Sequence, residues 1–142
     1  MNKENSISGP TILWSEVKDQ KVKSVDGKDM GKIKIISQNH FMVEKGLTKK
    51  TKFWIPKFLA DVYDGQCLWL NIEKKDIIDA FYYDEEPEIL RHQTDVSTFN
   101  TKYGINKTAD SYEKIPIAKN KYSSVTQQRG SKQHYKNIRD LK

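Results

Sequence analysis

Short runs of alternating apolar and polar residues follow one another through the first eighty residues of the chain. In residues 30–36, for example, Ile33 and Ile35 fall on one side, and Lys32 and Lys34 fall on the other. Successive side chains of a strand point to opposite faces, so each run predicts a strand with one buried face. The predicted strands are residues 21–25, 30–36, 41–44, 51–55 and 66–72, and residues 12–14 predict either the first strand or an anchor turn.

Turn residues separate these runs. Asp26-Gly27 and Asp64-Gly65 are typical of hairpin turns, and Gln38-Asn39 marks a further turn. Pro56 cannot donate a hydrogen bond to a neighbouring strand, so it closes the strand before it. Residues 73–80 predict one or two helical turns. Together, the strands predict an all-β fold, a small antiparallel β-barrel with a short helix after the last strand.

The strand over residues 51–55 carries the first candidate binding surface. Alternation assigns Phe53 and Ile55 to the interior, so Trp54 points outward. An exposed tryptophan beside lysines would be an anchor for a protein partner. The alternative is an edge whose lysines only prevent strand-to-strand aggregation. The candidate residues are Trp54, Met42, Lys45, Lys49, Lys50 and Lys52.

The composition changes after residue 81. Beyond this point apolar residues occur singly, so burying them would not repay the backbone entropy lost on folding, about 1–2 kcal/mol per residue. We expect a flexible leader at residues 1–11, a domain at 12–81 and a largely disordered tail at 82–142. The acidic run at residues 84–88 is then a solvated linker, and proteolysis is expected to leave a core ending near residues 80–90.

The formal net charge of +6 is concentrated at the C-terminal end, where lysines and arginines alternate with tyrosines. Basic side chains neutralise phosphates and tyrosines stack on unpaired bases, which is typical of nonspecific RNA or single-stranded DNA binding. A solubilising tail is the alternative. The candidate residues for nucleic-acid binding are Lys119, Lys121, Tyr122, Arg129, Lys132, Tyr135, Lys136 and Arg139.

A third interpretation of the tail is a short motif that docks on a protein through Ile115, Ile117 and Tyr122. Pro116 disfavours a helix at this point and favours an extended segment that adds to a sheet.

The sequence offers little for catalysis. Cys67 is the only cysteine, which leaves no disulfide and fits a small packing residue beside Trp69. His40, His92 and His134 are far apart in the chain and show no metal-ligand spacing. We therefore expect no enzyme, no cofactor and no metal. With no signal peptide and no long apolar run, we expect a cytoplasmic protein without integral membrane association.

The order of these segments resembles the PRC-barrel family: VDGKDMGKIKII, a hairpin ending in FMVEKG, then KFWIPKFLADVYDGQCLWLNIEKKDI. The resemblance covers about residues 18–80. It is carried by Asp26, Gly27, Gly31, Lys32, Glu44, Gly46, Trp54, Ile55, Pro56, Asp64, Gly65, Leu68 and Leu70.

The chain departs from several branches of that family. It lacks the membrane helix of the reaction-centre H subunit, the second domain of a ribosome-maturation factor and the long heptad helix of an archaeal division protein. It is most similar to stand-alone archaeal members. The resemblance implies a protein-interaction module with no catalytic residues to carry over.

These patterns together predict a non-enzymatic adaptor, whose barrel binds a protein partner and whose basic tail contacts a second one. The alternative is an RNA-associated or ribosome-associated factor that uses the tail. A homodimer is compatible with either.

Overall fold

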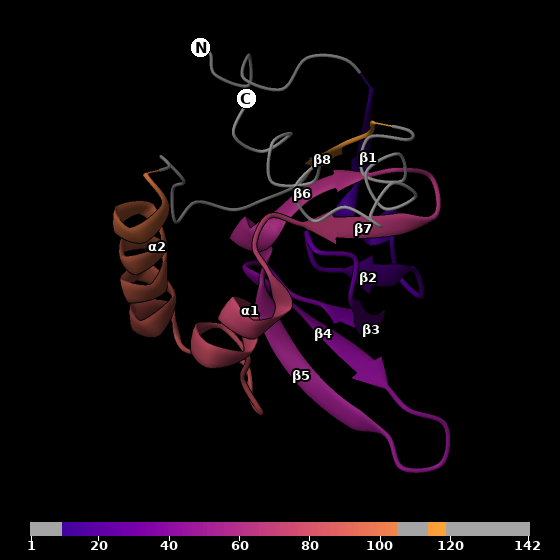
Figure 1. Cartoon of the computed structure of the whole chain (residues 1–142), viewed down its shortest axis with the longest axis horizontal. Helices are drawn as coiled ribbons and strands as arrows, with labels where there is room; N and C mark the ends of the chain where they lie inside the picture. Colours follow the sequence, from indigo (N-terminus) through magenta and orange to yellow (C-terminus); the bar gives the residue numbers. More distant parts are fainter. Residues whose placement is uncertain (1–9, 105–113, 119–142) are drawn as a thin grey trace.

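The computed structural model describes residues 10–104 and 114–118 of the chain. A six-stranded, twisted sheet forms its centre, with strands in the order β5-β4-β3-β2-β7-β6 (Figure 1). The strands are β2 (Lys21–Lys23), β3 (Asp29–Ile36), β4 (His40–Lys45), β5 (Thr51–Pro56), β6 (Ala60–Tyr63) and β7 (Cys67–Leu70).

Each of these strands lies within or beside a predicted run, except β6, which was not predicted. The strand that contains Trp54 ends at Pro56, as its missing N–H requires. A single 3₁₀ turn, η3 (Lys57–Leu59), then leads into β6.

The prediction of a closed antiparallel barrel is wrong in two respects. The sheet is not closed, because β5 and β6 are its two outer strands and do not pair with each other. In addition, β2 and β7 run parallel, with Val22 opposite Leu68. The parallel pair arises because β7 returns from the β6–β7 hairpin alongside β2 instead of alongside β5.

Two short strands form a second sheet. β1 (Thr11–Leu13) pairs antiparallel with β8 (Lys114–Pro116), and a 3₁₀ turn, η2 (Trp14–Glu16), follows β1. Ile117 continues from β8 to form a bridge with Tyr63, and the N–H of Ala118 donates to the Tyr63 carbonyl at 3.0 Å. The extended conformation expected around Pro116 is therefore present, and the segment adds to strands of its own chain.

Two helices follow the sheet. α1 (Lys74–Ala80) confirms the predicted helical turns. α2 (Ile89–Tyr103) contradicts the prediction of a disordered tail from residue 82, because its Val96 and Phe99 are buried in the main core. Within the described residues, no helix is long and apolar enough to cross a membrane.

The core lies between the strands, α1 and α2. Cys67 and Trp69 contact a small cluster on one face of β7, whereas Leu68 and Leu70 belong to the main cluster on the other. Cys67 is thus a packing residue, as its position beside Trp69 predicted. The main cluster comprises Trp14, Val17, Val22, Met30, Ile33, Phe41, Val43, Ile55, Phe58, Leu59, Leu68, Leu70, Ile72, Ile77, Phe81, Val96, Phe99 and Ile115.

Ile35 lies outside this core and is 47% exposed, contrary to the alternation of its strand. The β3–β4 register shifts between Ile33 and Ile35: Ile33 pairs with Val43, but Ile35 pairs with Met42. The extra residue of this bulge is Lys34, and it turns the second isoleucine to the outer face.

Candidate functional site

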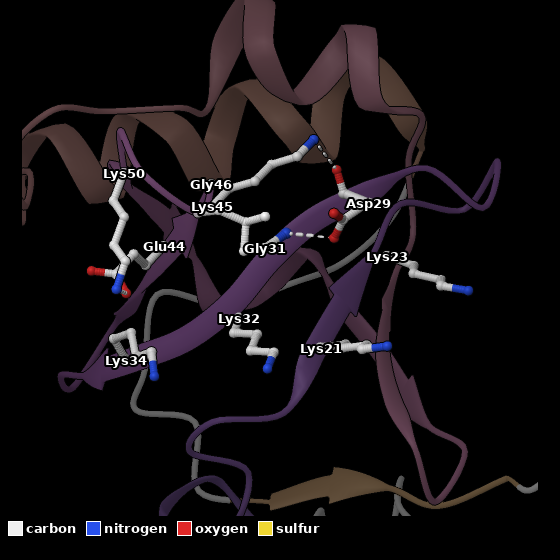
Figure 2. Close-up of a pocket in the computed structure, with 11 residues that line it drawn as sticks. Lys21, Lys23, Asp29, Gly31, Lys32, Lys34, Glu44, Lys45, Gly46 and Lys50 are labelled. Atoms are coloured by element: carbon white, nitrogen blue, oxygen red, sulfur yellow. Dashed lines mark hydrogen bonds and ion pairs between the residues drawn. The ribbon is translucent and has the colours of Figure 1, made fainter.

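The outer face of β2, β3 and β4 is hollowed into a groove of about 800 Å³ (Figure 2). Most of its lining side chains are lysines, and we refer to it as the lysine groove. It is lined by Lys21, Lys23, Asp29, Gly31, Lys32, Lys34, Glu44, Lys45, Gly46, Leu47 and Lys50.

Strand pairing brings these distant residues into one row. Lys21 of β2 lies opposite Lys32 of β3, which lies opposite Glu44 of β4, which in turn lies opposite Lys52 of β5. Residues directly opposite each other project from the same face of a sheet, with Cβ atoms about 4.5–5.5 Å apart. The register therefore places two lysines side by side in the groove, with one carboxylate next to them.

Gly31 shapes the floor of the groove. Its φ is +104°, and a Cβ at this position would lie 2.7 Å from the Glu44 carbonyl oxygen. Its N–H donates to Asp29 Oδ1 at 2.9 Å, and Lys45 Nζ donates to the Asp29 carbonyl at 3.1 Å. The glycine lets β3 and β4 approach closely, and the Asp29 contacts hold one lysine against this end of the groove (Figure 2).

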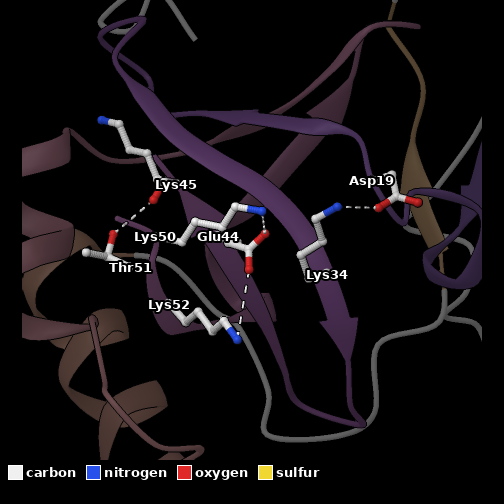
Figure 3. A network of polar contacts seen from close by, with 7 residues as sticks. All are labelled: Asp19, Lys34, Glu44, Lys45, Lys50, Thr51 and Lys52. Atoms are coloured by element: carbon white, nitrogen blue, oxygen red, sulfur yellow. Dashed lines mark hydrogen bonds and ion pairs between the residues drawn. The ribbon is translucent and has the colours of Figure 1, made fainter. Parts of the chain in front are cut away.

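Ion pairs hold three further lysines in this region (Figure 3). Lys50 and Lys52 each approach a different oxygen of Glu44, at 3.8 and 3.9 Å. Lys34 pairs with Asp19 at 2.9 Å, and this hydrogen bond lowers the pKa of the Asp19 carboxyl. All of these lysines are at least one-third exposed, so the pairs orient side chains more than they stabilise the fold.

Lys21 and Lys32 differ from these lysines, because neither forms an ion pair with another residue in the described part of the chain. They also line a neighbouring hollow of about 370 Å³, together with Lys23, Gln66 and Cys67. Because the two hollows share three lysines, the positive surface continues from the groove towards β7.

The α1 residue Lys74 adds to the crowding of positive charge. Partial burial lowers the pKa of its ammonium group, and the adjacent Lys45 lowers it further, whereas Asp29 raises it. Two ammonium groups this close favour a bound anion, because an anion would relieve their repulsion.

The predicted partner surface is brought together only in part. Lys45 and Lys50 line the groove, Lys52 borders it through Glu44, and Lys49 is exposed but does not line it. Of the two candidates that are not lysines, Met42 is only 7% exposed and is therefore not part of the accessible surface.

Trp54 is half-buried, not freely exposed as an anchor would be. The backbone N–H of Trp54 donates to the Tyr83 carbonyl at 2.7 Å, and the backbone N–H of Tyr83 donates to the Trp54 carbonyl at 3.0 Å. Next to this pair, Tyr82 stacks on Phe53 with ring centroids 4.1 Å apart. The segment after α1, read as linker from the sequence, thus runs along β5.

Sequence reasoning missed four lysines of the groove: Lys21, Lys23, Lys32 and Lys34. Their signal was the outward position of alternate lysines in two predicted strands, and only the pairing of those strands shows that they converge. The candidates for nucleic-acid binding, Lys119, Lys121, Tyr122, Arg129, Lys132, Tyr135, Lys136 and Arg139, lie outside the described residues.

Two histidines that are far apart in sequence meet in the fold. The His40 and His92 rings have centroids 5.2 Å apart, at the contact between β4 and α2. Even so, no group of three or more His, Cys, Asp or Glu side chains among residues 10–104 and 114–118 is arranged to hold a metal ion.

Comparison with models of known protein families, with curated proteins and with solved structures finds no match for the chain in any of the three. The lysine groove is therefore the feature of the chain that indicates a function. Its lysines come from three adjacent strands and the following hairpin, and they surround a concave surface large enough for several anionic groups.

Proposed function

We propose that the protein is a non-catalytic interaction module whose lysine groove binds an acidic segment of a protein partner. The observation that supports this is the convergence of six lysines on one hollow, to which the described residues contribute only two carboxylates, Asp29 and Glu44. A concave surface of one dominant charge attracts and orients a ligand of opposite charge.

The lining favours an acidic protein segment over single-stranded nucleic acid. Proteins that bind single strands stack bases on aromatic side chains, often with arginine beside them. Among residues 10–104 and 114–118, neither an aromatic residue nor an arginine lines the groove. Leu47, which is 94% exposed at the edge of the groove, adds an apolar contact suited to a peptide with mixed acidic and apolar residues.

The resemblance to PRC-barrel domains belongs to the same proposal, as does a cytoplasmic location. Two positions that carry the resemblance, Gly31 and Glu44, meet in the groove. In this proposal the protein is an adaptor, and the basic residues after position 118 supply a contact with a second partner.

The proposal predicts salt-sensitive binding of a short Glu-rich peptide that contains leucines, measured by fluorescence anisotropy with the full chain. Replacing Lys21 and Lys32 together by alanine should weaken binding about tenfold at low salt, because two exposed charge pairs contribute up to about 1 kcal/mol each. Raising the salt should shrink the difference, since charges separated by more than about 10 Å are screened at 0.1 M.

Matched controls distinguish binding at the lysine groove from nonspecific attraction to the positive net charge of the chain. A double variant with Lys75→Ala and Lys102→Ala removes the same charge from exposed helical positions and should bind as the unchanged protein does. A peptide with Gln in place of Glu should not bind. Equal weakening of peptide binding in both double variants would overturn the proposal. So would binding of poly(U) RNA that is tighter than binding of the Glu-rich peptide and that depends on Lys21 and Lys32.

A further inference from the structure

Three basic side chains are buried together where α2 contacts the sheet. They come from three elements: His40 from β4, Lys57 from η3 and His92 from α2. Their exposed fractions are 1%, 5% and 0%. We refer to these three residues as the buried basic cluster. Basic side chains are rarely so deeply buried, so the cluster needs a physical account.

The surroundings of the cluster stabilise one cation better than three. Glu86 Oε2 lies 3.6 Å from His40 Nδ1, beyond ordinary hydrogen-bond length, and accepts instead from the Ser37 hydroxyl at 2.5 Å. Lys57 Nζ lies 4.9 Å from the centre of the Trp14 ring, which stabilises its charge. The two imidazoles, in contrast, face each other with centroids 5.2 Å apart.

The same contact region holds α2 in place. On its apolar side, the Phe58 ring lies 5.1 Å from Phe99 and 5.9 Å from His92. On its polar side, the Tyr83 hydroxyl donates to Asp95 Oδ2 at 2.6 Å.

Arg91 approaches the other Asp95 oxygen at 3.1 Å. The charged groups that face the two imidazoles are therefore Lys57 and Glu86 beside His40, and Asp95 beside His92.

We propose that α2 is an acid-released cover: protonation of the buried His40 and His92 detaches the helix from the sheet and exposes the aromatic surface beneath it. Two imidazolium ions about 5 Å apart cannot both be stabilised without water. When α2 detaches, the His92 imidazole leaves with the helix and becomes solvated, and the His40 imidazole on the sheet becomes accessible to solvent.

Burial and, to a lesser extent, the neighbouring His92 lower the pKa of His40 to about 4, although Glu86 opposes this shift. Burial also lowers the pKa of His92, and Asp95 opposes this. A solvated histidine has a pKa near 6.5. At pH values between 6.5 and the lowered pKa values of His40 and His92 in the docked state, the detached state binds more protons than the docked state. Docking is therefore fully stable above about pH 6.5 and weakens as the pH falls.

Two other groups define where the effect should be measured. Burial lowers the pKa of Lys57 to about 8, so this side chain is mostly protonated below pH 7. Burial raises the pKa of Asp95, so its protonation favours docking at the acid end and opposes the histidines there. The interval from pH 7 to pH 5 is where the two histidines dominate.

Hydrogen exchange of the full chain, corrected for intrinsic rates, tests the proposal. From pH 6.5 to pH 5 the opening constant of the α2 amides should rise about tenfold per pH unit for each histidine involved. The amides of β3 and β4 should stay at least tenfold better protected, because the sheet itself does not open. In parallel, imidazole NMR signals should show two histidines that titrate well below pH 6.5.

Single variants His40→Phe and His92→Phe should each remove part of the pH dependence, and the double variant should be nearly insensitive to pH in this range. If a variant does not fold, the pH dependence of α2 hydrogen exchange in the unchanged protein still tests the proposal. Constant α2 protection from pH 7 to pH 5 would overturn the proposal. So would loss of protection in α2, β3 and β4 together at every pH.

Discussion

Gly31 lies where β3 passes close to the Glu44 carbonyl of β4, at the floor of the lysine groove. Its φ of +104° lies in a region that residues with a Cβ rarely adopt, and the Glu44 carbonyl occupies the space that a Cβ would need. The residue therefore combines two roles. It sets the backbone spacing of the sheet, and it keeps the groove concave between the lysines of neighbouring strands.

Replacing Gly31 by alanine should lower the free energy of unfolding by more than the usual cost of a strained backbone, about 1–3 kcal/mol. The excess is expected because the methyl group would displace the Glu44 carbonyl from its strand pairing. Gly104→Ala is the matched control: its φ is also positive, at +64°, but apart from its own helix and its chain neighbours no atom of the described residues lies within 4 Å of the added methyl. Urea denaturation should show a clearly smaller loss for the control, and equal losses would contradict the steric argument.

Single residues also show how far alternation can be trusted. It correctly assigned Ile33, Phe53 and Ile55 towards the core side, because no irregularity interrupts the pattern up to these positions. It failed for Ile35, because one bulge residue reverses every side chain after it. A bulge depends on how two strands pair, so the pattern within one strand cannot reveal it.

At the scale of elements, α2 is the main feature that the sequence did not disclose. Its buried stripe is His92, Asp95, Val96 and Phe99, at helical spacing, but only two of these residues are strongly apolar. Because the other members of the stripe are polar, the sequence shows no apolar periodicity typical of an amphipathic helix in this segment. Their burial is possible because the segment after α1 supplies partners, above all Tyr83 to Asp95. α1, in contrast, was predictable from the local pattern of residues 73–80.

Tyr83→Phe tests how much this connection stabilises α2. The change removes the hydroxyl that donates to Asp95 and accepts from Arg91 Nε at 3.2 Å, and it leaves a carboxylate that is only 3% exposed with fewer partners. The expected loss of unfolding free energy is about 1–3 kcal/mol. In Tyr63→Phe, the lost hydroxyl donates to the half-buried Gln20 at 3.2 Å and leaves no buried carboxylate behind, so the loss should be smaller. Equal losses in urea denaturation would contradict the assigned role of Tyr83.

At the scale of the whole molecule, strand pairing in the sheet brings together lysines that are far apart in the sequence. Lys21, Lys32 and Lys45 belong to three separate strands, and the groove exists only because of the register between those strands. The sequence could predict that lysines line one face of each strand. Strand order and register depend on long-range contacts, such as the parallel β2–β7 pair, that no local pattern specifies.

The described chain should also resist proteolysis as one unit that includes α2, and trypsin can test this at a single bond. Arg91 has a side chain that is 57% exposed, but cleavage after it requires α2 to unwind. Mass spectrometry of timed digests should therefore show slow cleavage after Arg91 in the full chain. Phe99→Ala should accelerate it by about a hundredfold or more, because removing a buried aromatic ring costs about 3–5 kcal/mol.

Gln93→Ala, on the exposed face of the same helix, is the control and should leave the cleavage rate nearly unchanged. The comparison separates a packed helix from one that only touches the sheet. If trypsin cut after Arg91 in the unchanged chain as fast as in an unfolded peptide, while the sheet stayed intact, α2 would not belong to the cooperative unit. The core would then end near residues 80–90, as the scattered apolar residues of the sequence first indicated. Slow cleavage that depends on Phe99 would instead establish that residues 89–103 are part of the folded domain.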